Sequence, residues 1–321
     1  MVNVSVLIAT HNRAALLRST LEQLSAQAFL TGDEVIVVDN ASTDDTADVI
    51  ARLKERFPVP LYRRYDGSEG KAPALNAAAR TVRGGVLALT DDDVLVSADW
   101  IEIIRRLFSD PSMALVGGRV DPHWQQPAPA WLEVEQNGRY GLMSSPLALL
   151  HYGEAQQLGR RTAIGANMAV RRSVFEALGG FAPHLGKKRG TLLCGEDHDL
   201  SQRAIAAGYR CEYRPELRVR HWVPAERTRL RYFLRWFYWS GITSAVIETT
   251  GTSDTAAERP ASRLHLLRRF LMSTVSAGVQ AISGRGRAAA QRAMDAAFAL
   301  GYLTIRVGGR ANLHRPGGVT R

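Results

Sequence analysis

The chain has 321 residues, of which 45% are apolar and 22% charged, a composition that is typical of globular proteins and argues against a disordered or fibrous chain. Its net charge of +10 is unevenly distributed: residues 1–225 hold 26 basic and 26 acidic side chains, whereas residues 226–321 hold 15 arginines and five acids. We therefore expect a neutral domain over residues 1–225 and a basic, mostly helical extension over residues 226–321 that favours anionic surfaces.

The two cysteines and the apolar runs indicate the compartment. Cys194 and Cys211 form no C-x-x-C motif, and two thiols without a secretory signal fit a reducing cytosol. The first ten residues lack the basic region that opens a signal peptide, and no run of 18 uncharged apolar residues occurs. These features predict a cytoplasmic protein without a membrane-spanning helix.

The first hundred residues alternate predicted strands and helices. Buried strands are expected at residues 4–10, 34–38 and 86–90, with a short strand at 61–64 and helices between them. This alternation predicts a mainly parallel, doubly wound sheet, which binds its ligands beyond the carboxyl ends of its strands. Polar clusters fall at three of those ends, at residues 11–13, 39–43 and 91–93.

The remaining chain is less regular. Residues 117–162 hold four prolines and two tryptophans, which indicates an irregular excursion that serves as a lid or a partner-binding segment. The elements expected after it are a strand at 164–170, helices at 173–178 and 195–207, strands at 210–214 and 217–220, a basic aromatic helix from about 227, a polar linker at 250–262, helices at about 263–283 and 287–306, and a disordered tail at 307–321.

Three consecutive aspartates, Asp91, Asp92 and Asp93, follow the predicted strand at 86–90. Carboxylates this close repel one another unless a positive charge joins them. A hard divalent cation is a suitable partner, since it takes carboxylate oxygens and shares its other positions with phosphates. The alternative is a solvated acidic loop that caps the next helix.

Two familiar phosphate-binding patterns are absent. The segment around Gly67, Gly70 and Lys71 lacks the glycine spacing of a phosphate-binding loop and the hydroxyl residue after its lysine. Residues 10–13 lack the glycines of a dinucleotide fingerprint. Kinase-type and nicotinamide-dependent chemistry are therefore poorly supported.

Six segments, taken in order, resemble the family 2 glycosyltransferases, which are inverting enzymes of the GT-A fold. They are VSVLIATHNR at 4–13, VIVVDNASTDDT at 35–46, GKAPALN at 70–76, LTDDD at 89–93, GANMAVRR at 165–172 and GEDHDL at 195–200. The resemblance covers roughly residues 2–222. It implies a GT-A nucleotide-diphospho-sugar transferase fold and a nucleotide-sugar donor, with uridine as the expected base. It also implies an acceptor hydroxyl on a glycan or a lipid-linked saccharide.

The resemblance assigns roles to the donor-binding residues. Asp91 and Asp93 match an Asp-x-Asp motif that holds the ribose and a metal ion, Mg²⁺ or Mn²⁺, with Asp93 as the direct ligand and Asp92 as an accessory group. Asp39 matches the acid that binds the nucleoside, although helix capping is an alternative. The further candidates for contact with the base or the phosphates are Thr10, Asn12, Arg13 and Lys71. For Arg13 and Lys71 the alternative is a solvated surface cation.

Inversion requires one base that takes the proton of the attacking hydroxyl. The resemblance assigns this role to the Glu196–Asp197 pair, with Asp197 favoured and Glu196 as competitor. The alternative is a pair of acids that favours a helix N-terminus. His221 is either a third metal ligand or a structural histidine. Trp124 and Trp131 either stack on an acceptor sugar or pack within the protein.

The basic extension has three interpretations. Amphipathic helices with interfacial aromatic residues fit an anionic membrane surface, which would make the protein peripheral at the inner face of the cell membrane. They also fit a helical partner or a homo-oligomer, whereas nucleic-acid binding is the least supported. Two other functions stay open: a sugar nucleotidyltransferase, whose Gly-rich, Arg-containing loop is missing after the first strand, and a non-catalytic nucleotide-sugar-binding protein.

Overall fold

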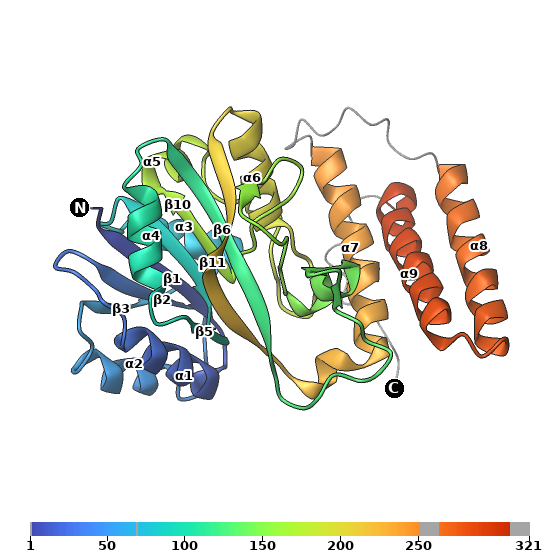
Figure 1. Cartoon of the computed structure of the whole chain (residues 1–321), viewed down its shortest axis with the longest axis horizontal. Coiled ribbons are helices and arrows are strands. Elements are labelled where there is room, and N and C mark those ends of the chain that lie inside the picture. The colour runs from blue at the N-terminus through green and yellow to red at the C-terminus, as the bar shows by residue number, and fades with distance from the viewer. Residues whose placement is uncertain (1, 69, 251–262, 309–321) are drawn as a thin grey trace.

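The computed structural model describes residues 2–68, 70–250 and 263–308 (Figure 1). Within these ranges a mixed sheet flanked by helices is followed by a helical C-terminal part. The strands are β1 (Val4–Thr10), β2 (Glu34–Asp39), β3 (Leu61–Tyr65), β4 (Val86–Asp91), β5 (Val94–Val96), β6 (Met113–Trp124), β7 (Glu135–Gln136), β8 (Arg139–Tyr140), β9 (Gln156–Gln157), β10 (Asn167–Arg171) and β11 (Arg210–Val223). The helices are α1 (Ala14–Ser25), α2 (Thr46–Lys54), α3 (Lys71–Ala79), α4 (Trp100–Phe108), η1 (Leu142–Leu147), α5 (Arg172–Ala177), α6 (Glu196–Ala206), η2 (Ala225–Thr228), α7 (Leu230–Thr250), α8 (Arg263–Ile282) and α9 (Gly286–Gly308).

The central sheet has the strand order β3-β2-β1-β4-β10-β6-β11-β5, with β9 paired to β11. The strands β1 to β4 are parallel, as predicted, and their apolar residues are buried because helices cover them. Their register sets Thr10 opposite Asp39 and Ala9 opposite Asp91. The polar clusters that follow these strands therefore meet at one edge of the sheet, which confirms the predicted convergence.

The other half of the sheet brings later segments to the same edge. Strand β10 is antiparallel to β4 and places Asn167 opposite Thr90. Strand β11 is parallel to β6 and antiparallel to β5, with His221 opposite Val94. The start of β10 and the end of β11 consequently lie beside the acidic turn between β4 and β5.

Two predictions about this half are wrong. The segment predicted to be irregular from residue 117 begins inside β6, because Pro122 lies beyond the part of β6 that pairs with β10 and a proline is tolerated there. The strands predicted at 210–214 and 217–220 form a single strand, β11, with a register shift between Arg214 and Arg218. Pro215 lies at that irregularity and makes one strand look like two in the sequence.

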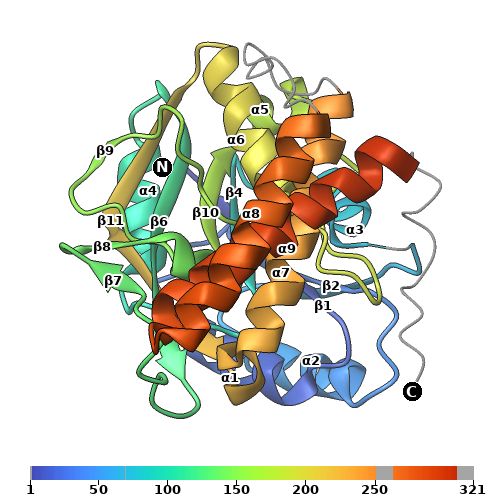
Figure 2. The same ribbon diagram turned by 90° about the vertical axis from the view of Figure 1, so that its right-hand side faces the viewer.

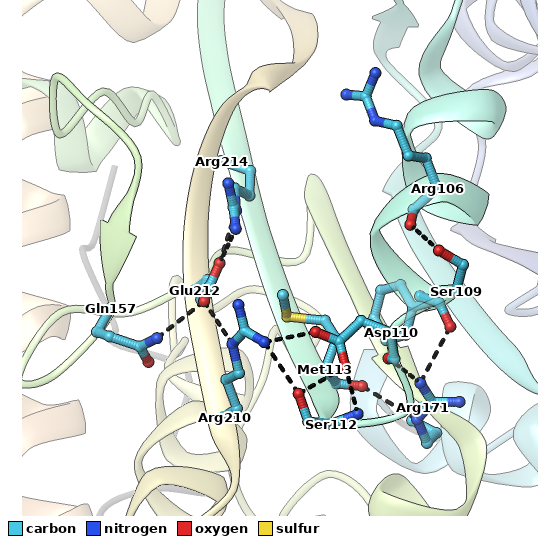
Figure 3. A network of polar contacts seen from close by, with 11 residues as sticks. Arg106, Ser109, Asp110, Ser112, Met113, Gln157, Arg171, Arg210, Glu212 and Arg214 are labelled. Carbon is cyan, nitrogen blue, oxygen red and sulfur yellow. Dashed lines mark hydrogen bonds and ion pairs between the residues drawn. The ribbon is translucent and has the colours of Figure 1, made fainter.

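A polar network fastens β11 to the turn that precedes β6 (Figure 3). Arg210 donates to Asp110 at 2.6 Å and to Glu212 at 2.7 Å, and Gln157 of β9 donates to Glu212 at 2.9 Å. Arg171 donates to the backbone carbonyl of Asp110 at 2.9 Å. Because Glu212 is buried, these partners satisfy a carboxylate that would otherwise be costly to bury.

The three C-terminal helices lie side by side, with α9 packed against both α7 and α8 and with α8 outermost (Figures 1 and 2). Close approach of α7 and α9 depends on glycine, since a Cβ at Gly241 would overlap the Phe298 carbonyl and one at Gly301 the Tyr238 carbonyl. Searching the described residues finds no helix whose length and apolarity suffice to cross a bilayer. The helices predicted at 263–283 and 287–306 are confirmed, whereas most of the linker at 250–262 and of the tail lies outside the described residues.

Candidate active site

A cavity of about 1170 Å³ lies at the edge of the sheet where the polar strand ends converge. It collects most of the residues singled out in the sequence: Thr10, Arg13, Lys71, Asp91, Asp92, Asp93, Glu196, Asp197 and His221. Within the described part of the chain, Asn12 and Asp39 are not among its lining residues. Segments more than 200 residues apart in the sequence thus share one site.

Asp91, Asp93 and His221 form the only group of at least three potential metal-binding side chains in the described ranges. One ligand atom from each lies within 4.8 Å of the others. Asp91 ends β4, Asp93 lies in the turn to β5, and His221 is brought in by the pairing of β11 with β5. The Trp222 amide donates to the Asp93 carbonyl at 2.8 Å and fixes this turn against β11.

The chemistry of this triad fits a divalent cation. Two carboxylates and an imidazole are suitable donors for Mg²⁺ or Mn²⁺. Asp93 Oδ1 lies 3.3 Å from His221 Nε2, and His221 Nδ1 is buried without a hydrogen-bond partner among the described residues. A divalent cation held by both groups would satisfy the buried carboxylate oxygen and a neutral imidazole nitrogen at once. Asp91, Asp93 and His221 would hold the ion.

Basic side chains surround the triad and stabilise its negative charge. Lys71 donates to Asp91 at 2.5 Å, and Arg13 contacts Asp93 at 2.7 Å, while Arg227 lies 3.9 Å from Asp93. Burial alone would raise the pKa of Asp91, but Lys71 holds it below its ordinary value. Burial likewise opposes ionisation of Asp93, yet His221, Arg13 and Arg227 keep its pKa well below the usual range. Both carboxylates are therefore ready to bind a cation.

Asp92 points to the scaffold rather than to the triad. Its carboxylate accepts hydrogen bonds from Thr10 at 2.7 Å and from Arg13 at 2.9 Å. Burial raises its pKa to about 6 against the opposing charge of Arg13. Asp92 thus ties the end of β1 to the acidic turn and positions Arg13, and the accessory role expected for it in donor binding stays a prediction.

Asp39 and Asn12 shape the loops behind the cavity. Asp39 is fully buried, accepts the Ser42 amide at 2.9 Å and accepts two bonds from Arg63 at 2.9 and 2.6 Å. Asn12 has a φ of 52° and its side-chain oxygen accepts the Thr43 amide at 2.7 Å. Asp39 thus bonds the turn after β2 and does not cap α2, which follows Asp45, so the helix-capping alternative is wrong. A role of either residue in nucleoside binding stays a prediction.

Glu196 and Asp197 open α6 and line the cavity near Lys71, whose positive charge both acids stabilise. Gly195 precedes them with a φ of 103°, a backbone conformation that favours glycine. Asp197 accepts the Gly165 amide at 2.9 Å and the His198 amide at 2.8 Å, so its carboxylate has a fixed orientation. Burial raises the pKa of Glu196 to about 7, and the nearby Asp197 charge contributes to this shift. The two acids are therefore held in different environments.

The raised pKa of Glu196 predicts a pH-dependent stability effect. A carboxyl that binds its proton more tightly when folded stabilises the fold fully below the ordinary pKa of 4.5, and this stabilisation is lost as the pH rises through about 7. Glu196→Gln should therefore raise the free energy of unfolding at pH 8 by up to about 3 kcal/mol and leave it nearly unchanged at pH 5. Denaturant melts at both pH values measure the effect, with exposed Glu102→Gln as control. Equal destabilisation by Glu196→Gln at both pH values would contradict it.

Helix α7 supplies a wall that the sequence did not reveal. Tyr232, Trp236 and Thr243 line the cavity, and Thr243 reaches the Cys194 amide at 3.4 Å. Arg63 and Arg227 were also missed, because their acidic partners come from other strands. Pairing the short strand at 61–64 with the strand at 34–38 would have suggested Arg63 as a partner of Asp39. No feature of the sequence indicated that Arg227 would approach Asp93.

The two tryptophans considered for acceptor stacking have structural contacts instead. Trp131 packs edge-on against Phe233 of α7 at a centroid separation of 5.0 Å, and Trp124 packs against the core. Neither is among the described residues that line the cavity. The packing alternative therefore accounts for both side chains.

Comparison with known proteins agrees with this architecture. The model of the family "Glycosyl transferase family 2" matches residues 5–179. The O-antigen chain rhamnosyltransferase RfbN of Salmonella typhimurium is 32% identical over 236 residues, which are 72% of this chain and 70% of that protein. The glucosyl-dolichyl phosphate glucuronosyltransferase of Haloferax volcanii is 26% identical over 264 residues, which are 76% of this chain and 77% of that protein.

A solved structure shares the fold. The mannosyltransferase PcManGT from Pyrobaculum calidifontis, determined in complex with GDP-Man and Mn²⁺, superimposes with a TM-score of 0.61 at 19% identity. The match covers 96% of this chain and 88% of that one. The fold is thus GT-A, as the sequence resemblance implied. The family model spans more than half of the chain, and the chain therefore belongs to glycosyl transferase family 2 and is a glycosyltransferase.

Proposed function

We propose that the protein is a metal-dependent inverting glycosyltransferase that moves a sugar from a nucleotide-sugar donor to an acceptor hydroxyl. One observation carries the proposal: the Asp91–Asp93–His221 triad and the Glu196–Asp197 pair share one cavity. The first group suits the diphosphate end of a donor, and the second suits an acceptor hydroxyl. Family membership supports the use of a nucleotide sugar.

The donor end of the cavity is positively charged outside the triad. Arg13, Lys71 and Arg227 line the same space, and their charges would attract the diphosphate of the donor. A bound divalent ion would supply Lewis-acid stabilisation of the charge that builds on the departing diphosphate. Arg13 and Lys71 already contact the acids of the triad, so they are placed to accompany the diphosphate without large movement.

The acceptor end supplies the base. Asp197 would take the proton of the attacking hydroxyl as its oxygen bonds to the anomeric carbon and the bond to the diphosphate oxygen breaks. Its bonds to the Gly165 and His198 amides orient the carboxylate for this transfer. Glu196 is the competing candidate, because a base whose pKa lies near 7 suits transfer at neutral pH.

We further propose that the acceptor is a growing glycan or a lipid-linked saccharide. The names of two relatives, which act on an O-antigen chain and on a glucosyl-dolichyl phosphate, support this acceptor class. Uridine is the donor base that we expect, although the GDP-Man complex of PcManGT makes guanosine donors an essential part of any screen.

A thermal-shift screen of nucleotide sugars tests the donor assignment. With Mn²⁺ present, the correct donor should raise the unfolding temperature above that of the protein with Mn²⁺ alone, because a ligand that binds the folded state stabilises it. Repeating the screen with excess chelator should remove most of that increase. A panel of uridine, guanosine, thymidine and cytidine donors without any shift would contradict the proposal.

A further inference from the structure

The outward face of α8 carries a continuous apolar stripe. Its exposed side chains are Leu264, Leu267, Leu271, Met272, Val275, Val279 and Ile282. They recur every three or four residues, which places them on one side of the helix. Exposure reaches 69% for Leu264 and 90% for Ile282, whereas Leu266 on the opposite side is 2% exposed in contact with the other C-terminal helices. Helix α8 lies on the outside of the three C-terminal helices (Figure 2), and the exposure of these side chains shows that the stripe lies on the outer side of that helix.

This stripe is too long to be incidental exposure. Twenty helical residues extend about 30 Å, and proteins without a partner rarely expose a contiguous apolar surface of that length. Helix α9 already packs on the inner side of α8. Residues 251–262 and 309–321 hold only Leu313 and Val319 as large aliphatic residues, so their composition is unsuited to cover the stripe.

The charge around the stripe indicates what covers it. Residues 263–294 contain six arginines and no acid, and three of these arginines, Arg269, Arg287 and Arg292, form ion pairs with Asp295 or Glu133. Arg268 is exposed within the stripe, one helical turn from Leu264 and Leu271, and Arg285 is exposed just beyond its end. A second copy docked through this face would set arginines against arginines without a carboxylate from the same segment. Lipid headgroups that carry negative charge would instead pair with the arginines while the stripe enters the interface.

We propose that α8 docks on an anionic lipid surface and lies in the plane of that surface. Docking would hold the cavity near lipid-linked acceptors, a consequence that rests on the proposed function. Helix α9 separates α8 from α7, which lines the cavity with Trp236 and Thr243. Two interhelical spacings of about 8–10 Å therefore separate the docked helix from the wall of the cavity. A saccharide attached to a lipid in that surface would enter the cavity from beside the helices.

Sedimentation of the full chain with vesicles tests the docking. The wild-type protein should bind phosphatidylcholine vesicles that contain phosphatidylglycerol, and raised salt should weaken this binding. The double variant Leu271→Ser/Val275→Ser should bind at least about tenfold more weakly, since both side chains would enter the lipid. Leu142→Ser, which changes an equally exposed leucine on η1, is the matched control and should bind like the wild type.

Other outcomes overturn the docking. Wild-type protein that does not bind the anionic vesicles, or a double variant that binds as tightly as wild type, contradicts it. A concentration-dependent dimer in analytical ultracentrifugation that the double variant abolishes would assign the stripe to a second copy. Arg268→Ser gives an independent test, because it should weaken binding to anionic vesicles without removing apolar surface. A control assay measures the release of nucleoside diphosphate with a soluble acceptor and without vesicles. These variants should release it at the wild-type rate, so the assay distinguishes a loss of docking from a loss of catalysis.

Discussion

Replacing Asp197 by asparagine is expected to lower turnover about 10²- to 10⁴-fold, the usual contribution of a positioned general base. Asparagine keeps the shape of the side chain and its oxygen can still accept the Gly165 amide, but it cannot take the proton of the acceptor hydroxyl. Donor affinity should change little, since Asp197 takes no part in the triad. Release of nucleoside diphosphate measures turnover, and calorimetric titration of the donor measures affinity.

Glu196→Gln is the matched comparison for this experiment. If Asp197 is the base, turnover should fall much less in Glu196→Gln than in Asp197→Asn. If Glu196 is the base, Glu196→Gln loses turnover and the rise of the wild-type rate with pH near 7 disappears in that variant. Full activity of Asp197→Asn would refute the assignment of the base to Asp197.

Replacing Asp93 by asparagine is expected to have the second large effect, a loss of at least about 10²-fold in metal-dependent donor affinity and turnover. Asp93 contributes one of the three ligand atoms of the triad, and its Oδ1 lies 3.3 Å from Nε2 of His221, another member of the triad. The substitution removes one negative charge from the proposed metal site. Calorimetric titration with Mn²⁺, followed by donor in the presence of Mn²⁺, measures both affinities.

Asp92→Asn provides the control for Asp93→Asn. The two residues are adjacent and chemically identical, but the Asp92 carboxylate bonds to Thr10 and Arg13 and takes no part in the triad. Its substitution should weaken Mn²⁺ binding far less than Asp93→Asn does. Equal losses of Mn²⁺ affinity in the two variants would mean that both substitutions disturb the structure of the acidic turn, and would contradict the assignment of Asp93 as a metal ligand.

Much of the sheet and of the candidate site was predictable from the sequence, because short stretches of neighbouring residues are enough to identify the strands and the motifs. Apolar runs identify β1, β2 and β4, and parallel pairing then requires their ends to meet, which places Asp91 beside the end of β1. The acids of α6 were found as part of an ordered set of motifs. What connects them to the cavity, the Gly165–Asp197 bond, depends on the pairing of β10 with β4 and has no signature in the sequence.

The parts that sequence reasoning missed depend on long-range packing. The aromatic residues near 232–239 suggest a helix at a membrane interface. In the structure, Phe233 and Phe237 are buried, and Tyr232 and Trp236 line the cavity. Helix α8 is apolar on both its inner and outer sides, so its sequence alone does not tell which side α9 covers. The division of the chain near residue 225 stays a prediction, although α7 contributes to the same core as the sheet.

We propose that this cavity transfers a sugar from a nucleotide-sugar donor with the help of a divalent metal ion. The most direct test measures nucleoside diphosphate and glycosylated product together, with the donor found by thermal shift and with a glycan or lipid-linked acceptor. We expect both products to form in equal amounts with Mn²⁺ or Mg²⁺, and we expect excess chelator to stop the reaction. Tight donor binding without either product, or turnover that chelator leaves unchanged, would contradict it.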